Sequence, residues 1–341
     1  MKILTVDGLQ RLISGVGRDL FFDMALKRLE QDFRRWQQFQ KSPRHAVHYP
    51  FGVIELMPCA DDEFYAFKYV NGHPYNTEHG RLCVIGLGLL ADARSGYPLL
   101  FCEMTLLTAI RTAAVAALGA KYLARSNSEH LAVIGTGAQS EFQVAMLARQ
   151  LPLKTVSFFD PDQQAMSKFV GNLRRSGLVL QPCSSIQQAV SAADLIVTAT
   201  ASKQANDLIQ REWLKPGVHI HAMGGDCPGK TELGQALLND SKIVVEYLPQ
   251  SLVEGEMQNL DPGSFYAELW QLVDGSLPGR ENESEITLFD SVGFALEDYS
   301  ILRLVMALVE QPEYAGLCLN QAMVPQLDNP KDLYGLLEGN G

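Results

Sequence analysis

The spacing of hydrophobic and polar residues changes along the chain and predicts two kinds of structure. Residues 19–39 place apolar side chains at helical intervals between charges, which predicts an amphipathic helix. Apolar runs separated by turn-rich pieces follow and predict the strands of an α+β domain. These runs lie at residues 52–57, 64–70, 82–90 and 99–103.

Further along the chain, strand and helix patterns alternate regularly. An Ala- and Leu-rich stretch at 105–124 predicts a long helix with Thr105 as its N-cap. Short apolar runs then alternate with helical stretches as far as residue 247, which indicates an α/β fold with a doubly wound parallel sheet. The expected helices of this unit lie at 138–150, 161–176 and 232–239, and a last helix is expected at 294–309.

Composition narrows the classes of protein that fit this pattern. The chain has 341 residues, 47% of them hydrophobic, which favours two folded domains. Its net charge of −11 argues against nucleic acid and anionic membranes as partners. No apolar run reaches the roughly 20 residues of a membrane helix. None of the six cysteines belongs to a CxxC or zinc-binding pattern, so we expect reduced cysteines, no metal site and a cytoplasmic protein.

A glycine-rich turn is the first candidate site. The apolar strand at 130–135 runs directly into the pattern Gly135-x-Gly137-x-x-Ser140. Glycine permits a tight turn at the first position and the close approach of a diphosphate at the second. The following helix offers unpaired N–H groups to the phosphates. Ser140 replaces the usual third Gly or Ala, but the position between a strand and a helix supports a dinucleotide site.

Asp160 ends the next strand, about 20 residues further on, where an acid binds the adenosine ribose hydroxyls. An acid there repels a 2′-phosphate, and the next residues, PDQQ, supply no cation to bind one. The sequence therefore predicts NAD as the cofactor rather than NADP. The alternative is that Asp160 only caps the following helix. No GxxxxGK[ST] pattern is present, which disfavours a kinase or NTPase.

Single charges in apolar segments form the second set of candidates. Arg111 is the only charged residue between Met104 and Ala120, and a buried guanidinium needs an anion. A substrate carboxylate or the cofactor diphosphate fits this role; the alternative is a solvated helix face. Glu55 and Lys68 are single charges in apolar strands, where exposure to solvent is also common.

The segment HAMGGDCPGKTEL, residues 221–233, follows an apolar strand and combines glycines, a proline and an acid. The carboxyl end of a parallel strand is where such folds bind ligands. Asp226 is therefore a candidate acid–base group and Lys230 a candidate cation for the cofactor, although Asp is also common in turns. Arg44, in KSPRHAV, is the weakest candidate of this kind.

Six segments together resemble the ornithine cyclodeaminase/μ-crystallin family over nearly the whole chain. They are SPRHAVHYPFGVIELMP, YAFKYVNGHP, ARSGYPLLFCEMTLLTAIRTAA, VIGTGAQSEFQ, HAMGGDCPGKTEL and FDSVGFALEDYS. GGDCPGKTEL and KYVNGHP are typical of the cyclodeaminase branch, whereas the glycine loop is shared with many dehydrogenases. The resemblance implies a Rossmann-type NAD-binding domain at residues 112–315. This domain would be inserted in an α+β domain, residues 1–111 plus 316–341, that binds substrate and forms a homodimer.

The resemblance also implies an activity, the conversion of L-ornithine to L-proline and ammonia with tightly held NAD and no net redox change. Hydride would leave Cα for NAD, the δ-amine would attack the resulting imine, and the hydride would return after ammonia departs. Asp226 and Glu55 would be the acids of the site, with Asp226 as the general acid–base group.

Further roles follow from the same resemblance. Three cations around the amino-acid carboxylate and one residue lining the substrate site would be Arg44, Lys68, Arg111 and Val292. The cofactor would be bound by Arg111, Gly135, Gly137, Ala138, Gln139, Asp160, Thr200, Met223, Lys230 and Ser291. Cys83 stands where relatives often have a threonine that contacts the cofactor.

The same residues also fit other functions within the family. The alternatives are an NAD-dependent amino-acid dehydrogenase or ketimine reductase, a lysine cyclodeaminase, and a non-catalytic binding protein of the μ-crystallin type. Asp160 disfavours an NADPH-dependent reductase. The acids Asp226 and Glu55 disfavour the binding protein, which would have no need of an acid–base group.

Overall fold

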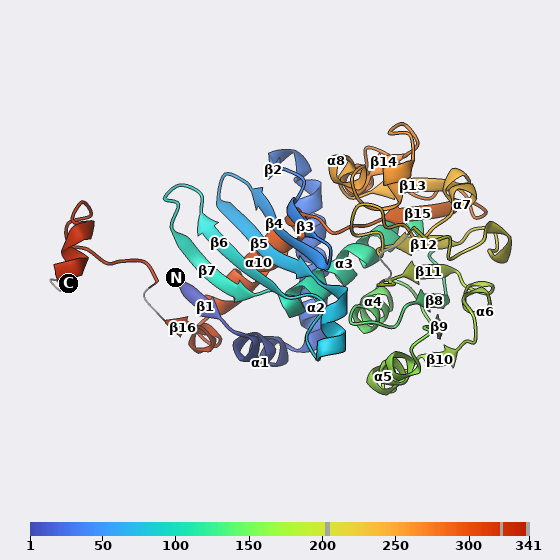
Figure 1. Cartoon of the computed structure of the whole chain (residues 1–341), viewed down its shortest axis with the longest axis horizontal. Helices are drawn as coiled ribbons and strands as arrows, with labels where there is room; N and C mark the ends of the chain where they lie inside the picture. The colour runs from blue at the N-terminus through green and yellow to red at the C-terminus, as the bar shows by residue number, and fades with distance from the viewer. Residues whose placement is uncertain (202–204, 321–322, 339–341) are drawn as a thin grey trace.

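The computed structural model describes residues 1–201, 205–320 and 323–338, and these form two eight-stranded sheets (Figure 1). Sheet A is mixed. Its order is β16 (Leu319–Asn320), β1 (Lys2–Leu4), β7 (Pro98–Glu103), β6 (Gly86–Asp92), β5 (Phe64–Gly72), β4 (Gly52–Ala60) and β2 (Gln40–Lys41), with β3 (His45–Tyr49) also paired to β4. The chain builds β1 to β7 first and returns to this sheet only through β16.

Sheet B is formed entirely by parallel pairs. Its order is β10 (Val179–Pro182), β9 (Thr155–Phe159), β8 (His130–Ile134), β11 (Leu195–Thr198), β12 (His219–Ala222), β15 (Ile286–Asp290), β13 (Ser241–Val245) and β14 (Ala267–Glu268). The chain runs from β8 to β9 on one side and then returns to β11 on the other, so the order reverses at β8. Such a reversal is where open α/β sheets bind ligands. The prediction of a Rossmann-type doubly wound sheet is thus confirmed.

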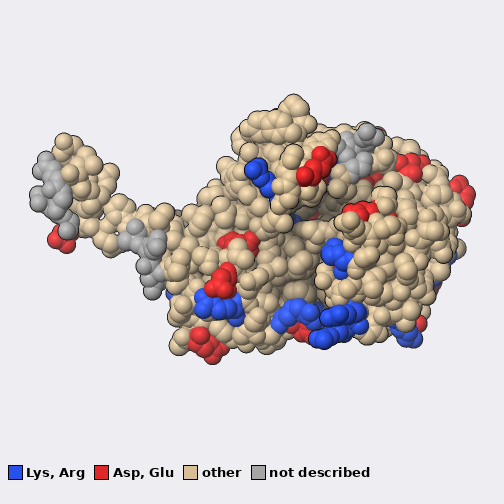
Figure 2. All heavy atoms as spheres, turned by 60° about the horizontal axis from the view of Figure 1, so that its bottom comes forward, with Lys and Arg blue, Asp and Glu red and all other residues tan. Residues whose placement is uncertain are grey.

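Helices cover one face of sheet A and both faces of sheet B. Those packed with sheet A are α1 (Val6–Val16), α2 (Arg18–Arg34), α3 (Thr105–Leu123) and α10 (Ala295–Val309). Those beside sheet B are α4 (Ser140–Leu147), α5 (Gln163–Leu173), α6 (Ile186–Val190), α7 (Gln235–Asn239), α8 (Leu248–Ser251) and α9 (Leu269–Val273). Short 3₁₀ helices lie at Trp36–Gln38, Pro74–His79, Arg211–Trp213, Glu256–Asn259, Ala315–Leu317 and Leu333–Glu338. The last described residues, 323–338, extend away from the rest of the chain (Figures 1 and 2).

The long helix α3 connects the two sheets. It contacts α2, α10 and β6 on one side and α4, β12 and β15 on the other. The larger hydrophobic core accordingly runs from Leu4 and Phe21 near sheet A to Val133 and Phe289 in sheet B. Alternate residues of β8 point the opposite way, and Ile134 belongs to a second core that is formed with α6 and α7.

Helix α3 is also the one helix of the described chain that is long and apolar enough to cross a membrane. Its mean hydropathy is 1.3, but 78% of it is buried inside the structure. A helix that is apolar on all sides suits such a core position.

The start of α3 corrects one prediction, because Thr105 is not its N-cap. Met104 occupies the cap position without a side-chain bond, and Thr105 is the first helical residue. The Glu103 carboxylate accepts hydrogen bonds from the backbone N–H groups of Thr105 and Leu106. The Thr105 hydroxyl instead accepts the Gly86 N–H at 3.0 Å, which ties the helix to β6.

Other differences concern element ends and missed elements. The helix expected at 19–39 ends at Arg34, and the strand expected at 82–90 begins only at Gly86 because the Asn71 side chain accepts the Ile85 N–H. Several elements had no counterpart in the sequence analysis, namely strands β1, β2, β3, β14, β15 and β16 and helices α1, α8 and α9. The other expected strands and helices are present, with ends that differ by a few residues.

The division of the chain at residues 111 and 315 stays a prediction. Residue 111 lies inside α3, which packs on both sheets. Helix α10 lies before residue 315 in the chain and packs against β4, β5, β6 and β7 of sheet A. The chain therefore crosses back toward sheet A between β15 and α10.

Close packing between α3 and β15 leads to a stability prediction. A Cβ added at Gly119 would lie 2.6 Å from the fully buried ring of Phe289, whereas one added at Gly171 in α5 would meet nothing within 4 Å. Gly119→Ala should lower the free energy of unfolding, because overpacking costs about 1–3 kcal/mol. Gly171→Ala should raise it by up to about 1 kcal/mol, the gain in helix propensity. Urea unfolding of both variants checks this, and equal stabilisation by the two would contradict the packing argument.

Candidate active site

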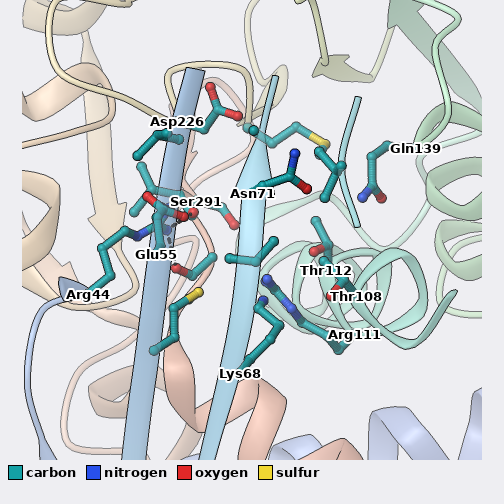
Figure 3. A pocket seen from close by; sticks show the side chains of 18 residues that line it. Arg44, Glu55, Lys68, Asn71, Thr108, Arg111, Thr112, Gln139, Asp226 and Ser291 are labelled. Atoms are coloured by element: carbon teal, nitrogen blue, oxygen red, sulfur yellow. Dashed lines mark hydrogen bonds and ion pairs between the residues drawn. The ribbon is translucent and has the colours of Figure 1, made fainter. Parts of the chain in front are cut away.

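A pocket of about 160 Å³ lies between the two sheets (Figure 3). Strands β4 and β5 of sheet A form one wall and α3 forms the floor. Loops that follow β8, β12 and β15 of sheet B close the remaining side. Nine of the residues singled out from the sequence line this pocket: Arg44, Glu55, Lys68, Arg111, Gln139, Met223, Asp226, Ser291 and Val292.

The remaining predicted residues lie beside the pocket, along the carboxyl edge of sheet B. Gly135 follows β8, Asp160 follows β9, and Thr200 comes two residues after β11. Because parallel strands end at the same edge, residues far apart in sequence are brought together there. The other residues at this edge are Gly137, Ala138 and Lys230.

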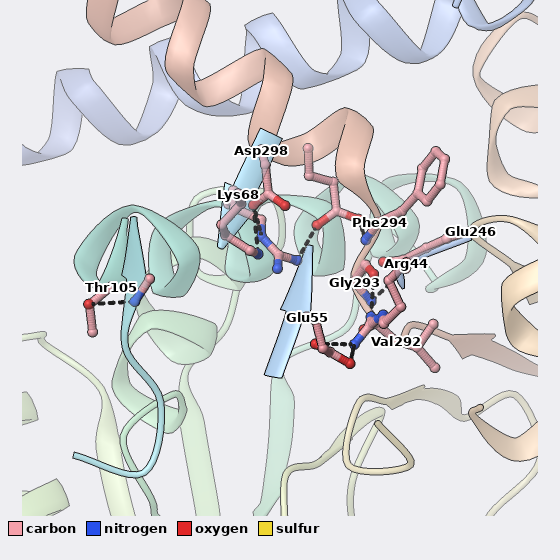
Figure 4. Close-up of polar contacts among 12 residues, drawn as sticks. Arg44, Glu55, Lys68, Thr105, Glu246, Val292, Gly293, Phe294 and Asp298 are labelled. Atoms are coloured by element: carbon pink, nitrogen blue, oxygen red, sulfur yellow. Dashed lines mark hydrogen bonds and ion pairs between the residues drawn. The ribbon is translucent and has the colours of Figure 1, made fainter. Parts of the chain in front are cut away.

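A buried cluster of two cations and two acids forms the inner end of the pocket (Figure 4). Lys68 Nζ lies 2.9 Å from Asp298 Oδ1, and Arg111 Nε lies 3.0 Å from the same oxygen. Arg111 Nη1 also donates to Glu297 at 2.6 Å. Burial and the neighbouring Arg111 lower the pKa of Lys68 to about 8. Arg111 lines the pocket, and its Nη2 makes no hydrogen bond within the described part of the chain.

Arg44 occupies the opposite side of the pocket beside Glu55. Its Nη1 donates to the Glu55 carboxylate at 3.1 Å, and its Nη2 donates to the carbonyls of Val292 and Gly293 at 2.5 and 2.7 Å. Its Nε lies 3.2 Å from Glu254. All three nitrogens thus face protein atoms, and Arg44 links β4 to the loop after β15. Burial raises the pKa of Glu254 to about 7, against the opposing effect of Arg44.

Asp226 is the exposed acid of the pocket. Its side chain is 57% exposed, whereas Lys230, which it contacts at 3.0 Å, is 5% exposed. Lys230 also donates to the Thr200 carbonyl at 2.9 Å. The acid–base candidate is therefore accessible, and its neighbouring cation is fixed to the end of β11.

The glycine loop has the form that a diphosphate requires. Gly135 has φ +93°, and a Cβ there would lie 2.6 Å from the Ala199 carbonyl oxygen. A Cβ on Gly137 would meet nothing within 4 Å, so the space above this residue is open. Gln139 lines the pocket, and its buried Oε1 has no hydrogen-bond partner within the described residues. An unsatisfied buried acceptor suits a donor group on a ligand.

Asp160 does not cap the helix that follows it. Asp162 is the N-cap of α5 and accepts the Gln164 N–H at 2.8 Å. The Asp160 carboxylate accepts the backbone N–H of Thr136 in the glycine loop at 2.7 Å and that of Asp162 at 2.9 Å. It therefore holds β9 against the glycine loop, beside the position that a ribose would take in a Rossmann site.

Several charged residues of the site were missed by the sequence analysis. They are Glu232, Glu246, Glu254, Glu297 and Asp298. Glu297 and Asp298 had a usable signal, since they are adjacent acids within the largely apolar segment of α10. That is the signal which identified Arg111 as a candidate. Glu246 accepts the Gly293 N–H at 2.7 Å, a contact that the sequence alone does not indicate.

Cys83 precedes the pocket-lining residue Val84, and its carbonyl accepts the His73 N–H at 2.8 Å. Within residues 1–201, 205–320 and 323–338, no group of three His, Cys, Asp or Glu side chains is arranged to hold a metal ion.

The parallel sheet, the glycine loop and the adjacent charged pocket define a Rossmann-type protein with a ligand site at the sheet's carboxyl edge. Comparison with known proteins is consistent with this class. The model of the ornithine cyclodeaminase/mu-crystallin family matches residues 8–312. The ornithine cyclodeaminase of Agrobacterium tumefaciens (strain Ach5) is 47% identical over 337 residues, which cover 99% of this chain and 94% of that protein.

Two solved structures share the whole architecture. An archaeal alanine dehydrogenase dimer with bound NAD has a TM-score of 0.84 and 31% identity, covering 92% of this chain and 97% of that one. The Δ1-pyrroline-2-carboxylate reductase of Thermococcus litoralis, in complex with NADH and L-proline, has a TM-score of 0.87 and 28% identity, covering 94% and 100%. The chain belongs to the ornithine cyclodeaminase/mu-crystallin family, as its sequence segments predicted.

The shared acid of the inner cluster leads to a second stability prediction. Asp298→Asn leaves Lys68 and Arg111 buried beside a neutral side chain, and removing one partner of a buried ion pair costs about 3–5 kcal/mol. Asp240→Asn is the matched control, because Asp240 pairs with Arg211 at the surface, where such pairs contribute about 1 kcal/mol or less. Urea unfolding measures the free energy of unfolding of both variants, and we expect the larger loss in Asp298→Asn. Equal losses would show that the buried ion pairs contribute no more to stability than a surface pair.

Proposed function

We propose that this protein is an enzyme that converts L-ornithine to L-proline and ammonia with bound NAD. The observation that carries the proposal is that the exposed acid Asp226, a second acid and buried cations line one pocket beside the glycine loop. The full-length similarity to an ornithine cyclodeaminase supports the choice of substrate. Hydride transfer needs the substrate Cα beside a nicotinamide, and a charged pocket next to the glycine loop supports an amino-acid site adjacent to a dinucleotide site.

The carboxyl edge of sheet B binds NAD in this proposal. The open space at Gly137 and the N–H groups at the start of α4 receive the diphosphate. Asp160 binds the ribose and selects against a 2′-phosphate. The remaining cofactor contacts come from Arg111, Gly135, Ala138, Gln139, Thr200, Met223, Lys230 and Ser291.

The inner cluster receives the substrate carboxylate. Arg111 Nη2 has no hydrogen-bond partner in the described chain, and Lys68 Nζ lies beside it through their shared contact with Asp298. Two cations at a desolvated carboxylate fix the orientation of the substrate. Arg44 is the third cation of the pocket and lies on its opposite side, where it holds Glu55 in position, and Val292 supplies an apolar contact.

Two acids suit a substrate with two amino groups. Asp226, which is accessible to the pocket, accepts the proton of the α-ammonium group and later returns a proton to the departing ammonia. Glu55 lies across the pocket, bound to Arg44, and contacts the side-chain amine. When bound, NAD supplies the hydride acceptor at Cα and afterwards the hydride donor. The walls around Met57 and Val70 limit access of water, which would otherwise hydrolyse an imine.

A homodimer forms through the uncovered face of sheet A in this proposal. Leu56, Tyr69 and Leu87 lie side by side on β4, β5 and β6 of this face, and Leu56 and Leu87 are 42% and 41% exposed. A contiguous apolar sheet face of this kind marks a protein interface. We also place the enzyme in the cytoplasm, a reducing compartment, because its six cysteines are scattered and follow no CxxC or zinc-binding pattern.

The activity is tested by incubating the purified protein with L-ornithine and no added electron acceptor. We expect ammonia and L-proline in equal amounts without accumulation of NADH. NADH that accumulates after addition of NAD⁺ would instead identify a dehydrogenase, and the absence of either product would favour a binding protein. L-Lysine in a parallel reaction measures the preference for side-chain length.

Asp226→Asn should abolish turnover and leave NAD bound, because the amide keeps the shape of the side chain but accepts no proton. A loss of about 100-fold or more in kcat is expected for an acid–base group. The measurement is steady-state proline formation, with bound nucleotide determined after denaturation. Near-normal turnover would move the proton-transfer role to Glu55.

Asp160→Ala should weaken NAD⁺ binding and narrow the preference for NAD⁺ over NADP⁺, because the ribose contact and the repulsion of a 2′-phosphate are both removed. Dissociation constants of the two nucleotides measure this. Asp162→Ala is the control, since it removes the cap of α5 but leaves the Asp160 carboxylate in place. If the ratio of the two dissociation constants is unchanged in Asp160→Ala, Asp160 does not bind the ribose.

The dimer is tested by the double substitution Leu56→Lys and Leu87→Lys, which places charges on the apolar face of sheet A. We expect a monomer by sedimentation equilibrium. Val170→Lys is the control, because Val170 is similarly exposed, at 39%, but lies on α5 beside sheet B. A dimer that survives the double substitution would require another interface.

A further inference from the structure

Three buried carboxylates follow one another along the carboxyl edge of sheet B. Asp290 accepts the backbone N–H groups of Glu256 and Met257 at 3.0 and 3.1 Å. Glu256 in turn accepts those of Glu232 and Leu233 at 2.9 and 3.1 Å. Each acid thereby fixes the backbone that carries the next one. We call Asp290, Glu256 and Glu232 the carboxylate chain.

Glu232 ends the carboxylate chain by binding two separate segments. Its Oε1 accepts the Thr200 N–H at 2.9 Å and also the Thr200 hydroxyl. Its Oε2 accepts the Gly224 N–H at 3.0 Å. One carboxylate thus joins the residues that follow β11 to the residues that follow β12. Glu232 is fully buried, so it does not itself meet a ligand in the pocket.

The glycines of this region are explained by the carboxylate chain. A Cβ at Gly224 would coincide with the Glu232 carboxylate, and a Cβ at Gly255 would lie 2.6 Å from Asp290 Oδ1. Any larger residue at either position would displace the acid from the N–H groups it binds. The glycine that begins GGDCPGKTEL is therefore required by an acid of the same motif.

The loop that carries Asp226, residues 224–230, is fixed at both ends by these contacts. We call it the Asp226 loop. Gly224, two residues before Asp226, is bound by Glu232 directly. Lys230, four residues after it, bonds both Asp226 and the Thr200 carbonyl, and Thr200 is held by Glu232. The contacts close a ring in which Asp226 is the one member whose side chain is largely exposed.

We propose that Glu232 is a positioning residue for the reaction, which holds the Asp226 loop and Thr200 in one fixed relation. The inference rests on the proposed function, because it assigns Glu232 to the placement of the acid–base group. It concerns orientation and not affinity, since the substrate carboxylate is bound at the other end of the pocket by Lys68 and Arg111. A misplacement of about 1 Å at an acid–base group costs about 100-fold in rate.

Glu232→Gln is the first test. A carboxamide has one accepting oxygen, so in either orientation its NH₂ group faces an N–H donor. The hydrogen bond to the Thr200 N–H or the one to the Gly224 N–H is therefore lost. We expect kcat for L-ornithine to fall about 100-fold, with KM within twofold of the parent value and NAD still bound. Hydrogen–deuterium exchange of residues 224–232 should become faster, a readout that does not depend on activity.

A milder variant keeps the test valid if Glu232→Gln fails to fold. Thr200→Val removes only the hydroxyl donor and leaves the backbone contacts, so a smaller loss in kcat of the same kind is expected. Glu212→Gln makes the same chemical change at an exposed site beside sheet B and should leave kcat and exchange unchanged.

The outcomes separate this inference from the proposed function. If the parent enzyme makes no proline, the proposed function fails, while exchange in the loop still reports whether Glu232 holds it. If the parent is active and Glu232→Gln loses thermal stability with kcat per bound NAD unchanged, Glu232 is only structural. A rise in KM with normal kcat, or loss of NAD, likewise overturns the positioning role.

Discussion

The arrangement of the chain around the pocket depends on one constraint, which is that its buried cations need anionic partners. Lys68 and Arg111 come from β5 and α3, and both meet Asp298, which begins the return of the chain toward sheet A. A guanidinium or ammonium left without such a partner in the interior is strongly destabilising. The residues after β15 are therefore essential to the pocket, since α10 supplies the acids that pair with its two buried cations.

This constraint also explains why the pocket is formed from distant parts of the chain. Arg44 binds the carbonyls of Val292 and Gly293, so the loop after β15 is held from both sides of the pocket. The two acids Glu55 and Asp226, which line the pocket, are held by separate cations, Glu55 by Arg44 and Asp226 by Lys230. Placement of these groups is shared among β4, α3 and the loops of sheet B, and no single element carries the site.

The parts that could be predicted from sequence are those whose signal is local. The glycine loop, Asp160 and the alternation after residue 130 have fixed spacings, and the lone Arg111 was recognisable as a buried charge. Glu232 and Glu246 could not be assigned, because they bind the backbone N–H groups of Thr200 and Gly293, which are distant in the chain. Helix α1 was missed although Leu9, Leu12 and Ile13 have helical spacing, and the cap of α3 was misassigned because Glu103 reaches forward from the preceding strand. The short strand β15 was missed because its five residues, all buried, have no alternating pattern.

Helix α3 has a consequence for how the molecule unfolds. Its residues belong to one core that reaches from Phe21 beside sheet A to Phe289 in sheet B, so neither sheet keeps its apolar surface covered when the other is lost. Proteins built from two sheets often melt in separate steps when a linker alone joins them. In this chain α3 contacts both sheets, so the loss of one sheet would expose apolar surface that belongs to the core of the other. We therefore expect sheets A and B to unfold together in one cooperative step.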